Sequence, residues 1–118
     1  MWFRVRKGLN EGEDIAAKYL KQQGYRIITQ NWRAKFGEID IIAQDKDVLV
    51  FVEVKHRKSA QYGQPAAFVR MQKQGRILRT AKLYLLKNKT GGNVRFDVVE
   101  VLGYHPPQVN HIKNAFIS

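Results

Sequence analysis

Residues 37–55 read GEIDIIAQDKDVLVFVEVK, two apolar segments separated by the polar link Asp45-Lys46-Asp47. Both segments are rich in β-branched residues, and Val48 to His56 is the most strand-like part of the chain. Because the link between them is short and polar, we expect Gly37 to Gln44 and Val48 to His56 to form an antiparallel hairpin.

The segments on either side complete an α/β pattern. Apolar residues at helical spacing predict a helix over 11–23, with Asn10 as its cap and Gly24 at its end. A strand is expected over 25–32. A second helix is expected after Gly63 and Pro65, with its regular part beginning at Gly75 and its end near Lys87. A strand over 94–102 and a short strand over 109–112, which pairs with it, complete the pattern. The order αβββαβ predicts one α/β domain over residues 1–118.

The positive charge of the chain is regional. The 118 residues carry a formal net charge of +11, and ten basic residues but no acid occupy 55–89. Such a concentration favours a polyanion partner, here DNA, because Lys and Arg that neutralise phosphates release condensed counterions. The alternative is a solvated face that keeps the protein soluble. The absence of cysteine excludes a disulfide scaffold, a Cys-ligated zinc site and a thiol nucleophile.

No segment of the sequence is typical of a membrane span. The longest uninterrupted apolar run, Val48 to Val52, is far shorter than the ~20 residues that a spanning helix needs. No apolar stretch of signal-peptide length follows the basic residues near Met1. We therefore expect a cytoplasmic protein without membrane contact.

The acidic residues of residues 37–55 are placed in a pattern. Because side chains alternate along a strand, Glu38 and Asp40 share one face, and so do Glu53 and Lys55. In the expected hairpin, Asp40, Glu53 and Lys55 converge on one patch. Mg²⁺ is held by one or two carboxylates plus substrate phosphate oxygens, so the patch suits metal-assisted phosphodiester cleavage. The alternative is surface ion pairs, Glu53 with Lys55 or Glu38 with Arg33, each worth ~0 to 1 kcal/mol.

These residues carry a family resemblance. Asp40, followed after twelve residues by Glu53-Val54-Lys55, resembles the PD-(D/E)XK nuclease superfamily, which includes restriction endonucleases and archaeal Holliday junction resolvases. A fuller set of motifs resembles the endonuclease-like YraN family of small bacterial proteins: GEID at 37–40, FVEVK at 51–55, Tyr62-Gly63 and RFDVV at 95–99. The resemblance extends from about Glu11 to Phe116. It implies a restriction-endonuclease-like core, with a mixed central sheet flanked by helices.

The resemblance also implies roles for single residues. Asp40 and Glu53 would be the metal-binding carboxylates and Lys55 the catalytic lysine. Glu13 falls where superfamily members add an acid from the first helix, and its alternative role is that of an acid favoured by the helix macrodipole. Glu38, on the same face as Asp40, would lie just behind the ligands.

We therefore expect an endonuclease that depends on Mg²⁺ or Mn²⁺ and cuts branched or duplex DNA, as a homodimer if it acts like a resolvase. Structure-selective binding is favoured, because phosphate contacts fix register but carry no sequence. The rival is a nucleic-acid-binding module that has the fold without turnover. The residues expected to contact phosphates are Lys73, Arg76, Arg79, Lys82 and Arg57. Of these, Lys73 lies near a lysine position of the family, and a solvated face is its alternative.

The remaining polar and aromatic residues are expected to be structural. Asp97 is expected to pair with neighbours of Arg95 or with a turn. The histidines show no metal-ligand spacing and are expected at the surface: His56, His105 and His111. Packing is favoured over base stacking for Trp2, Trp32 and Tyr62.

Overall fold

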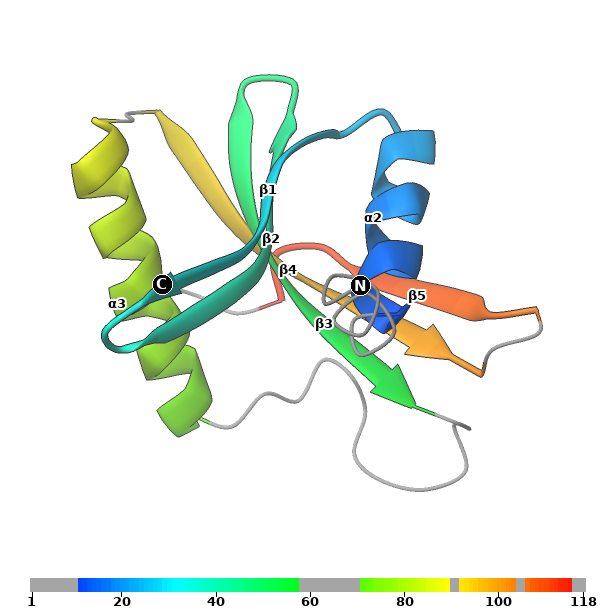
Figure 1. The fold of residues 1–118 in the computed structure, drawn as a ribbon. Coiled ribbons are helices and arrows are strands. Elements are labelled where there is room, and N and C mark those ends of the chain that lie inside the picture. Colours follow the sequence, from blue (N-terminus) through cyan, green and yellow to red (C-terminus); the bar gives the residue numbers. More distant parts are fainter. Residues whose placement is uncertain (1–10, 58–70, 90–91, 104–105, 116–118) are drawn as a thin grey trace, which may run out of the picture.

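A mixed β-sheet forms the centre of the molecule, with helices against both faces (Figure 1). The computed structural model describes residues 11–57, 71–89, 92–103 and 106–115. The elements are α2 (Glu11–Gln22), β1 (Arg26–Ala34), β2 (Gly37–Asp45), β3 (Val48–Arg57), α3 (Met71–Asn88), β4 (Asn93–Leu102) and β5 (Gln108–Ile112). The strands lie in the order β1-β2-β3-β4-β5, and the predicted α/β fold is confirmed.

Both predicted strand pairings are present. β2 and β3 form the antiparallel hairpin, with registers from Ile41 opposite Val52 to Asp45 opposite Val48. The turn is tight because Lys46 adopts a φ of 57°. β4 and β5 also pair antiparallel across the proline loop. Between these two pairs, β3 and β4 run parallel, so the sheet is mixed as expected.

The sheet is buried on both faces, which explains the continuous apolar sequence of β3. Leu49 and Phe51 point to the side of α3, where they pack with Ile77 and Tyr84. Val50 and its neighbours on the opposite face pack against α2 in a second cluster. The two helices therefore stand on opposite faces of the sheet (Figure 1).

The helix boundaries agree closely with the sequence. α2 ends just before Gly24, whose φ of 96° reverses the chain without the strain that a side chain would add. In α3, the predicted apolar face holds, but the helix is already regular from Met71, so the expectation that its regular part begins at Gly75 was wrong. The expected cap Asn10 and the expected helix start near Gly63 and Pro65 lie outside the described residues.

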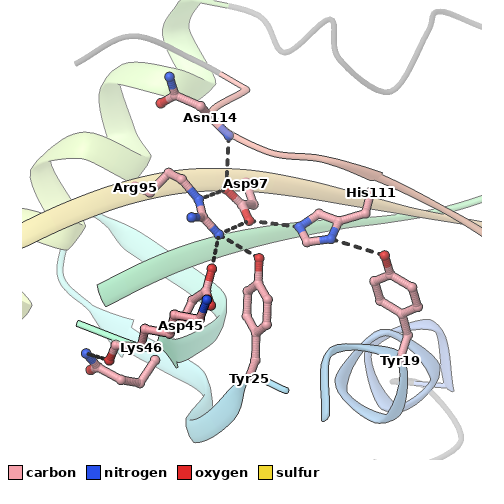
Figure 2. Close-up of polar contacts among 9 residues, drawn as sticks. Tyr19, Tyr25, Asp45, Lys46, Arg95, Asp97, His111 and Asn114 are labelled. Atoms are coloured by element: carbon pink, nitrogen blue, oxygen red, sulfur yellow. Dashed lines mark hydrogen bonds and ion pairs between the residues drawn. The ribbon is translucent and has the colours of Figure 1, made fainter. Parts of the chain in front are cut away.

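A buried polar network ties the far end of the sheet together (Figure 2). Asp97 is fully buried and accepts hydrogen bonds from Arg95 Nε at 2.9 Å, Arg95 Nη2 at 3.1 Å and the Asn114 backbone N–H at 3.0 Å. His111 Nε2 lies 2.8 Å from the same carboxylate, and His111 Nδ1 lies 3.2 Å from the Tyr19 hydroxyl. The structural role expected for Asp97 agrees with this geometry.

The surface role expected for His111 was wrong. Its side chain is 5% exposed and lies between Asp97 and the rings of Tyr19 and Tyr25. His56 also has a defined contact, because its Nε2 lies 3.2 Å from the Gly103 carbonyl oxygen. Trp32 packs edge-on against Tyr84 at 5.3 Å between ring centroids, as expected for a packing residue. His105, Trp2 and Tyr62 lie outside the described residues.

Candidate active site

The site lies where β2 and β3 stop pairing. Ile41 opposite Val52 is the last pair of their ladder, and Asp40 and Glu53 are the next residue on each strand. Beyond this point β2 continues with β1 alone, and the β1–β2 hairpin turns toward α3 (Figure 1). Asp40 Oδ2 accepts a hydrogen bond from the Val54 backbone N–H at 2.8 Å, in place of the ladder bond that β2 no longer supplies.

A pocket of about 210 Å³ opens at this point. Its floor comes from the strands and one wall comes from the first turns of α3. The residues that line it are Gly37, Glu38, Asp40, Glu53, Lys73, Arg76 and Ile77. The predicted convergence of Asp40 with Glu53 is therefore present, and Glu38 reaches the same pocket.

The ionised form of Asp40 is unfavourable in this pocket. Burial and, after it, the neighbouring Glu53 carboxylate raise the pKa of Asp40 to about 8, while the hydrogen bond from Val54 acts in the opposite direction. The charges of Glu13 and Glu38 add to the same repulsion. Near neutral pH the group is therefore stabilised by either a proton or a nearby cation.

Glu13 approaches the same cluster from α2. Its carboxyl is buried, and within the described part of the chain its Oε1 has no hydrogen-bond partner. Burial raises the pKa of Glu13 to about 7, with repulsion from Glu38 and Asp14 as the next causes and a hydrogen bond from Asn31 opposing them. An acid that served only the macrodipole would stay in water, so its burial and its unpaired oxygen favour a role in the cluster.

The counter-charge of Glu53 comes from α3. Lys73 Nζ lies 2.5 Å from Glu53 Oε2, with the Glu53 side chain 7% exposed. The ion pair of Glu53 with Lys55 that the hairpin alone suggested is therefore replaced by one with Lys73. Lys55, the third residue expected to converge with Asp40 and Glu53, does not line the pocket. It lies two residues further along the same face of β3, beside Glu100 of the neighbouring parallel strand.

Two further ion pairs lie near the site, one outside the pocket lining and one that includes Glu38 of the lining. Arg57 Nε lies 3.0 Å from Glu100 Oε2, and both side chains are largely buried. Arg33 Nε lies 3.1 Å from Glu38 Oε1 in an exposed pair, as one alternative interpretation expected. The phosphate contact predicted for Arg57 stays a prediction. Because Glu100 contacts Nε, the phosphate would have to bind the other nitrogens of the guanidinium.

The predicted basic residues of α3 start at the pocket and continue outward. Lys73 and Arg76 line the pocket, and Arg79 and Lys82 are exposed further along the helix. These four positions follow one another by three residues, so each is rotated by about 60° from the last and together they wind from the site toward solvent. The Tyr62-Gly63 motif lies outside the described residues.

Sequence reasoning missed the partners of Glu53 and Arg57. Lys73 and Glu100 belong to elements far along the chain, and no local pattern links them to the hairpin. The cluster of ten basic residues in 55–89 was the one available signal for Lys73, because a buried Glu53 needs a cation as its partner.

The donor set is suited to a loosely held divalent cation. Within residues 11–57, 71–89, 92–103 and 106–115, no group of three or more His, Asp or Glu side chains is arranged to hold a metal ion. Mg²⁺ does not need such a group, because it keeps several waters and takes further oxygens from a phosphate substrate. Asp40 and Glu53 are the residues that would hold it, with Glu13 next to them.

Comparison with known proteins places the chain among bacterial relatives. The sequence model of uncharacterised protein family UPF0102 matches residues 12–101. A UPF0102 protein from Persephonella marina is 46% identical over 107 residues, which cover 90% of each chain. Another from Alkaliphilus oremlandii is 49% identical over 89% of this chain and 93% of its own. A third from Syntrophus aciditrophicus is 48% identical over 98% of this chain and 95% of its own. None of the helices that the structure describes is long and apolar enough to cross a membrane.

Proposed function

The chain belongs to uncharacterised protein family UPF0102, the YraN family that its motifs resemble, and we propose that it is a metal-dependent endonuclease that hydrolyses phosphodiester bonds in DNA. The observation that carries the proposal is the pair of carboxylates, Asp40 and Glu53, at the end of the β2–β3 ladder, facing a pocket whose other wall is cationic. Carboxylates hold a metal ion and cations hold phosphate, so the two walls suit the two halves of one reaction.

The electrostatics of the pocket support a divalent cation. Asp40 and Glu13 both have raised pKa values, because they are buried near other carboxylates. A positive ion between Asp40 and Glu53 would remove this repulsion. Bound Mg²⁺ or Mn²⁺ would polarise a phosphoryl oxygen and lower the pKa of a water molecule.

The remaining residues of the site act on the substrate. Arg76 stands on the α3 wall, where it can hold a phosphate against the carboxylates, and Lys73 can join it once a metal ion takes its place beside Glu53. Lys55 follows Glu53 on the same strand face, where its ammonium group can orient the attacking water or offset charge in the transition state. Arg79 and Lys82 extend the cationic surface along α3 and would hold the flanking DNA backbone.

The substrate is DNA recognised by its shape, and a homodimer would present two such sites to a symmetric branched substrate. The rival function is DNA binding without turnover. The α3 surface would serve that role equally well, but a binding module gains nothing from carboxylates that repel one another beside phosphate-binding cations. The carboxylate cluster therefore favours the enzyme.

The test is a cleavage panel of four-way, flap, nicked, duplex and single-stranded DNA with EDTA, Mg²⁺ or Mn²⁺. We expect metal-dependent cleavage of a branched substrate, and we expect Glu53→Ala and Lys55→Ala each to slow it by about a hundredfold or more. Full activity in both variants would mean that the site is elsewhere. Binding by the wild type without cleavage under any metal would favour the rival.

Metal binding provides a separate measurement. Calorimetry with Mn²⁺ should show affinity at least about tenfold weaker in Asp40→Asn than in the wild type. The matched control is Asp47→Asn, which changes an exposed carboxylate in the turn at the other end of β2 and should bind the metal like the wild type. Equal affinity in all three proteins would exclude Asp40 as a ligand.

A further inference from the structure

The tip of the β1–β2 hairpin exposes an aromatic ring. Ala34 opposite Gly37 is the last pair of this hairpin, so Lys35 and Phe36 form its tip. Phe36 is 49% exposed, and among the described residues it and Leu86 are the exposed large hydrophobic side chains. One exposed apolar side chain is common on a protein surface, so the surroundings of the ring decide whether it is a contact residue.

The hairpin is held in place against α3. Close to the tip, where Trp32 pairs with Ile39, the Trp32 ring packs edge-on against Tyr84. At its tip, the Arg79 guanidinium lies 6.0 Å from the centroid of the Phe36 ring. A Cβ added to Gly37 would lie 3.4 Å from Thr80 Oγ1, so the hairpin passes close to a side chain of α3 here. The ring is therefore presented from a fixed position and would lose little conformational entropy on binding.

The surroundings of the ring are cationic and adjoin the candidate active site. Lys35, Arg76 and Arg79 are exposed around the hairpin tip or on the facing turns of α3, and the exposed Arg33 of the same tip is paired with Glu38. A depression of about 330 Å³ runs along residues 33–38. Its lining includes Gly37 and Glu38, which also line the pocket of Asp40 and Glu53. The exposed ring and the carboxylates thus belong to one continuous surface.

We propose that Phe36 is a stacking platform for an unstacked base of a nucleic acid whose backbone lies on the surrounding cations. The chemistry follows from the pairing of an aromatic face with guanidinium and ammonium groups, since bases stack on such rings while phosphates bind the charges. Arg79, which already lies over one side of the ring, can also stack on the base. The surrounding positive charge favours a polyanion over an apolar protein surface.

The stacking role of Phe36 rests on the proposed function, and it restricts the class of DNA that the enzyme would cut. In a continuous duplex both faces of each base are covered by neighbouring bases. A ring at the protein surface therefore gains a contact only where a base is free, as at a branch, flap or single-stranded end. The hairpin thus makes the enzyme selective for DNA with an unstacked base beside the phosphate that reaches the pocket.

The experiment measures binding, and it is independent of cleavage. The full chain in EDTA is titrated into a flap DNA with 2-aminopurine at the branch and into a duplex of equal length, with anisotropy for affinity and 2-aminopurine fluorescence for stacking. We expect Phe36→Ala to bind the flap about tenfold more weakly, to bind the duplex within about twofold of the wild type, and to lose the fluorescence change. Phe36→Tyr should match the wild type in flap affinity, duplex affinity and fluorescence change. The matched control is Leu86→Ala, which removes the other exposed apolar side chain and should behave like the wild type.

The outcomes separate this proposal from the one it rests on. If the wild type binds and cleaves the flap but Phe36→Ala binds it equally well, the stacking platform is wrong and the endonuclease stands. An equal loss on flap and duplex also overturns it, because the ring would then serve general binding. If the wild type binds neither DNA in EDTA and cleaves neither with Mg²⁺ or Mn²⁺, both proposals fail. Selective loss on the flap, with rescue by tyrosine, supports the stacking platform even if no metal activates cleavage.

Discussion

Asp40 serves structure and chemistry at once. Its carboxylate completes the hydrogen bonding of Val54 where the β2 ladder ends, and it does so beside Glu53. The first contact fixes the side chain, and the second makes its negative charge costly. A carboxylate that is held in place and whose charge is costly is the kind of ligand that the proposed metal ion would need.

The raised pKa of Asp40 predicts how stability depends on pH. With a pKa of about 8 in the folded protein and about 4 in the unfolded chain, the folded state holds the extra proton between these values. The free energy of unfolding of the metal-free protein should therefore fall as pH rises from about 4 to about 8. Asp40→Asn cannot ionise and should flatten this slope, leaving the smaller contribution of Glu13, whose pKa is about 7.

Urea unfolding in EDTA at several pH values measures how the free energy of unfolding depends on pH. The same series with Mg²⁺ measures how much stability the ion adds. Added Mg²⁺ should increase the free energy of unfolding of the wild type at pH 8, because the ion binds only the folded state. It should not do so in Asp40→Asn, because this variant lacks the carboxylate that would bind the ion. Parallel pH profiles for the two proteins would show that Asp40 ionises freely in the folded state.

Asp97 represents the opposite electrostatic case. Burial raises the pKa of Asp97, but hydrogen bonds from His111, Arg95 and Asn114 outweigh it and hold the pKa below its ordinary value. The network thus stabilises the charged form, a contribution that is present at neutral pH and lost as pH falls through the acidic range.

Asp97→Ala should cost about 3–5 kcal/mol of unfolding free energy at pH 7, because it removes the nearer carboxylate from the half-buried Arg95, which keeps Asp45, and removes the acceptor of the Asn114 N–H. Urea unfolding measures the loss. The control is Asp47→Ala, an exposed turn residue that should stay within about 0.5 kcal/mol of the wild type. A small loss of unfolding free energy in Asp97→Ala would mean that water can replace the carboxylate. Such a result would contradict the complete burial of Asp97.

At the scale of elements, local patterns were sufficient for strands and hairpins but not for how distant elements meet. The alternation of β2 and the short Asp45-Lys46-Asp47 turn determine the hairpin, and with it the meeting of Asp40 and Glu53. The Lys73 ion pair depends on where α3 lies across the sheet, which packing decides. His111 was misjudged for the same reason, since its burial comes from α2 and β4.

α2 must lie very close to β3 for Glu13 to reach the site, and Gly12 allows this. A Cβ on Gly12 would lie 2.8 Å from the Cβ of His56, too close for the helix to stay where it is. Gly12→Ala should therefore cost about 1–3 kcal/mol in urea unfolding, although alanine favours helices. It should also weaken Mn²⁺ binding, because Glu13 moves with the helix.

Gly75 offers a matched control in α3. An added Cβ there meets only the end of the Arg79 side chain at 3.6 Å, an ordinary contact. Gly75→Ala should therefore stabilise the protein by about 0.5–1 kcal/mol through helix propensity. If both glycine variants are stabilised, α2 does not lie on β3 as closely as described.

At the scale of the whole molecule, charge is divided between the faces of the sheet. The segment from 55 to 89 holds ten basic residues and no acid, and its described helix, α3, borders the candidate active site. α2 stands on the opposite face with its own exposed lysines, Lys18 and Lys21. Net charge alone would allow DNA to bind either face, so the location of the carboxylates is what assigns the binding role to α3.

Charge reversal on each helix tests this assignment. Converting Arg76, Arg79 and Lys82 together to glutamate should weaken binding to any DNA and should reduce the slope of log affinity against log salt by about 0.9 for each phosphate that the variant no longer neutralises. Converting Lys18 and Lys21 to glutamate should lower affinity only slightly and leave the slope unchanged, because long-range repulsion is screened within ~10 Å at 0.1 M salt. Anisotropy titrations over a salt series measure both quantities. A slope that falls with the α2 variant and stays constant with the α3 variant would place the DNA on the other face, away from Asp40 and Glu53.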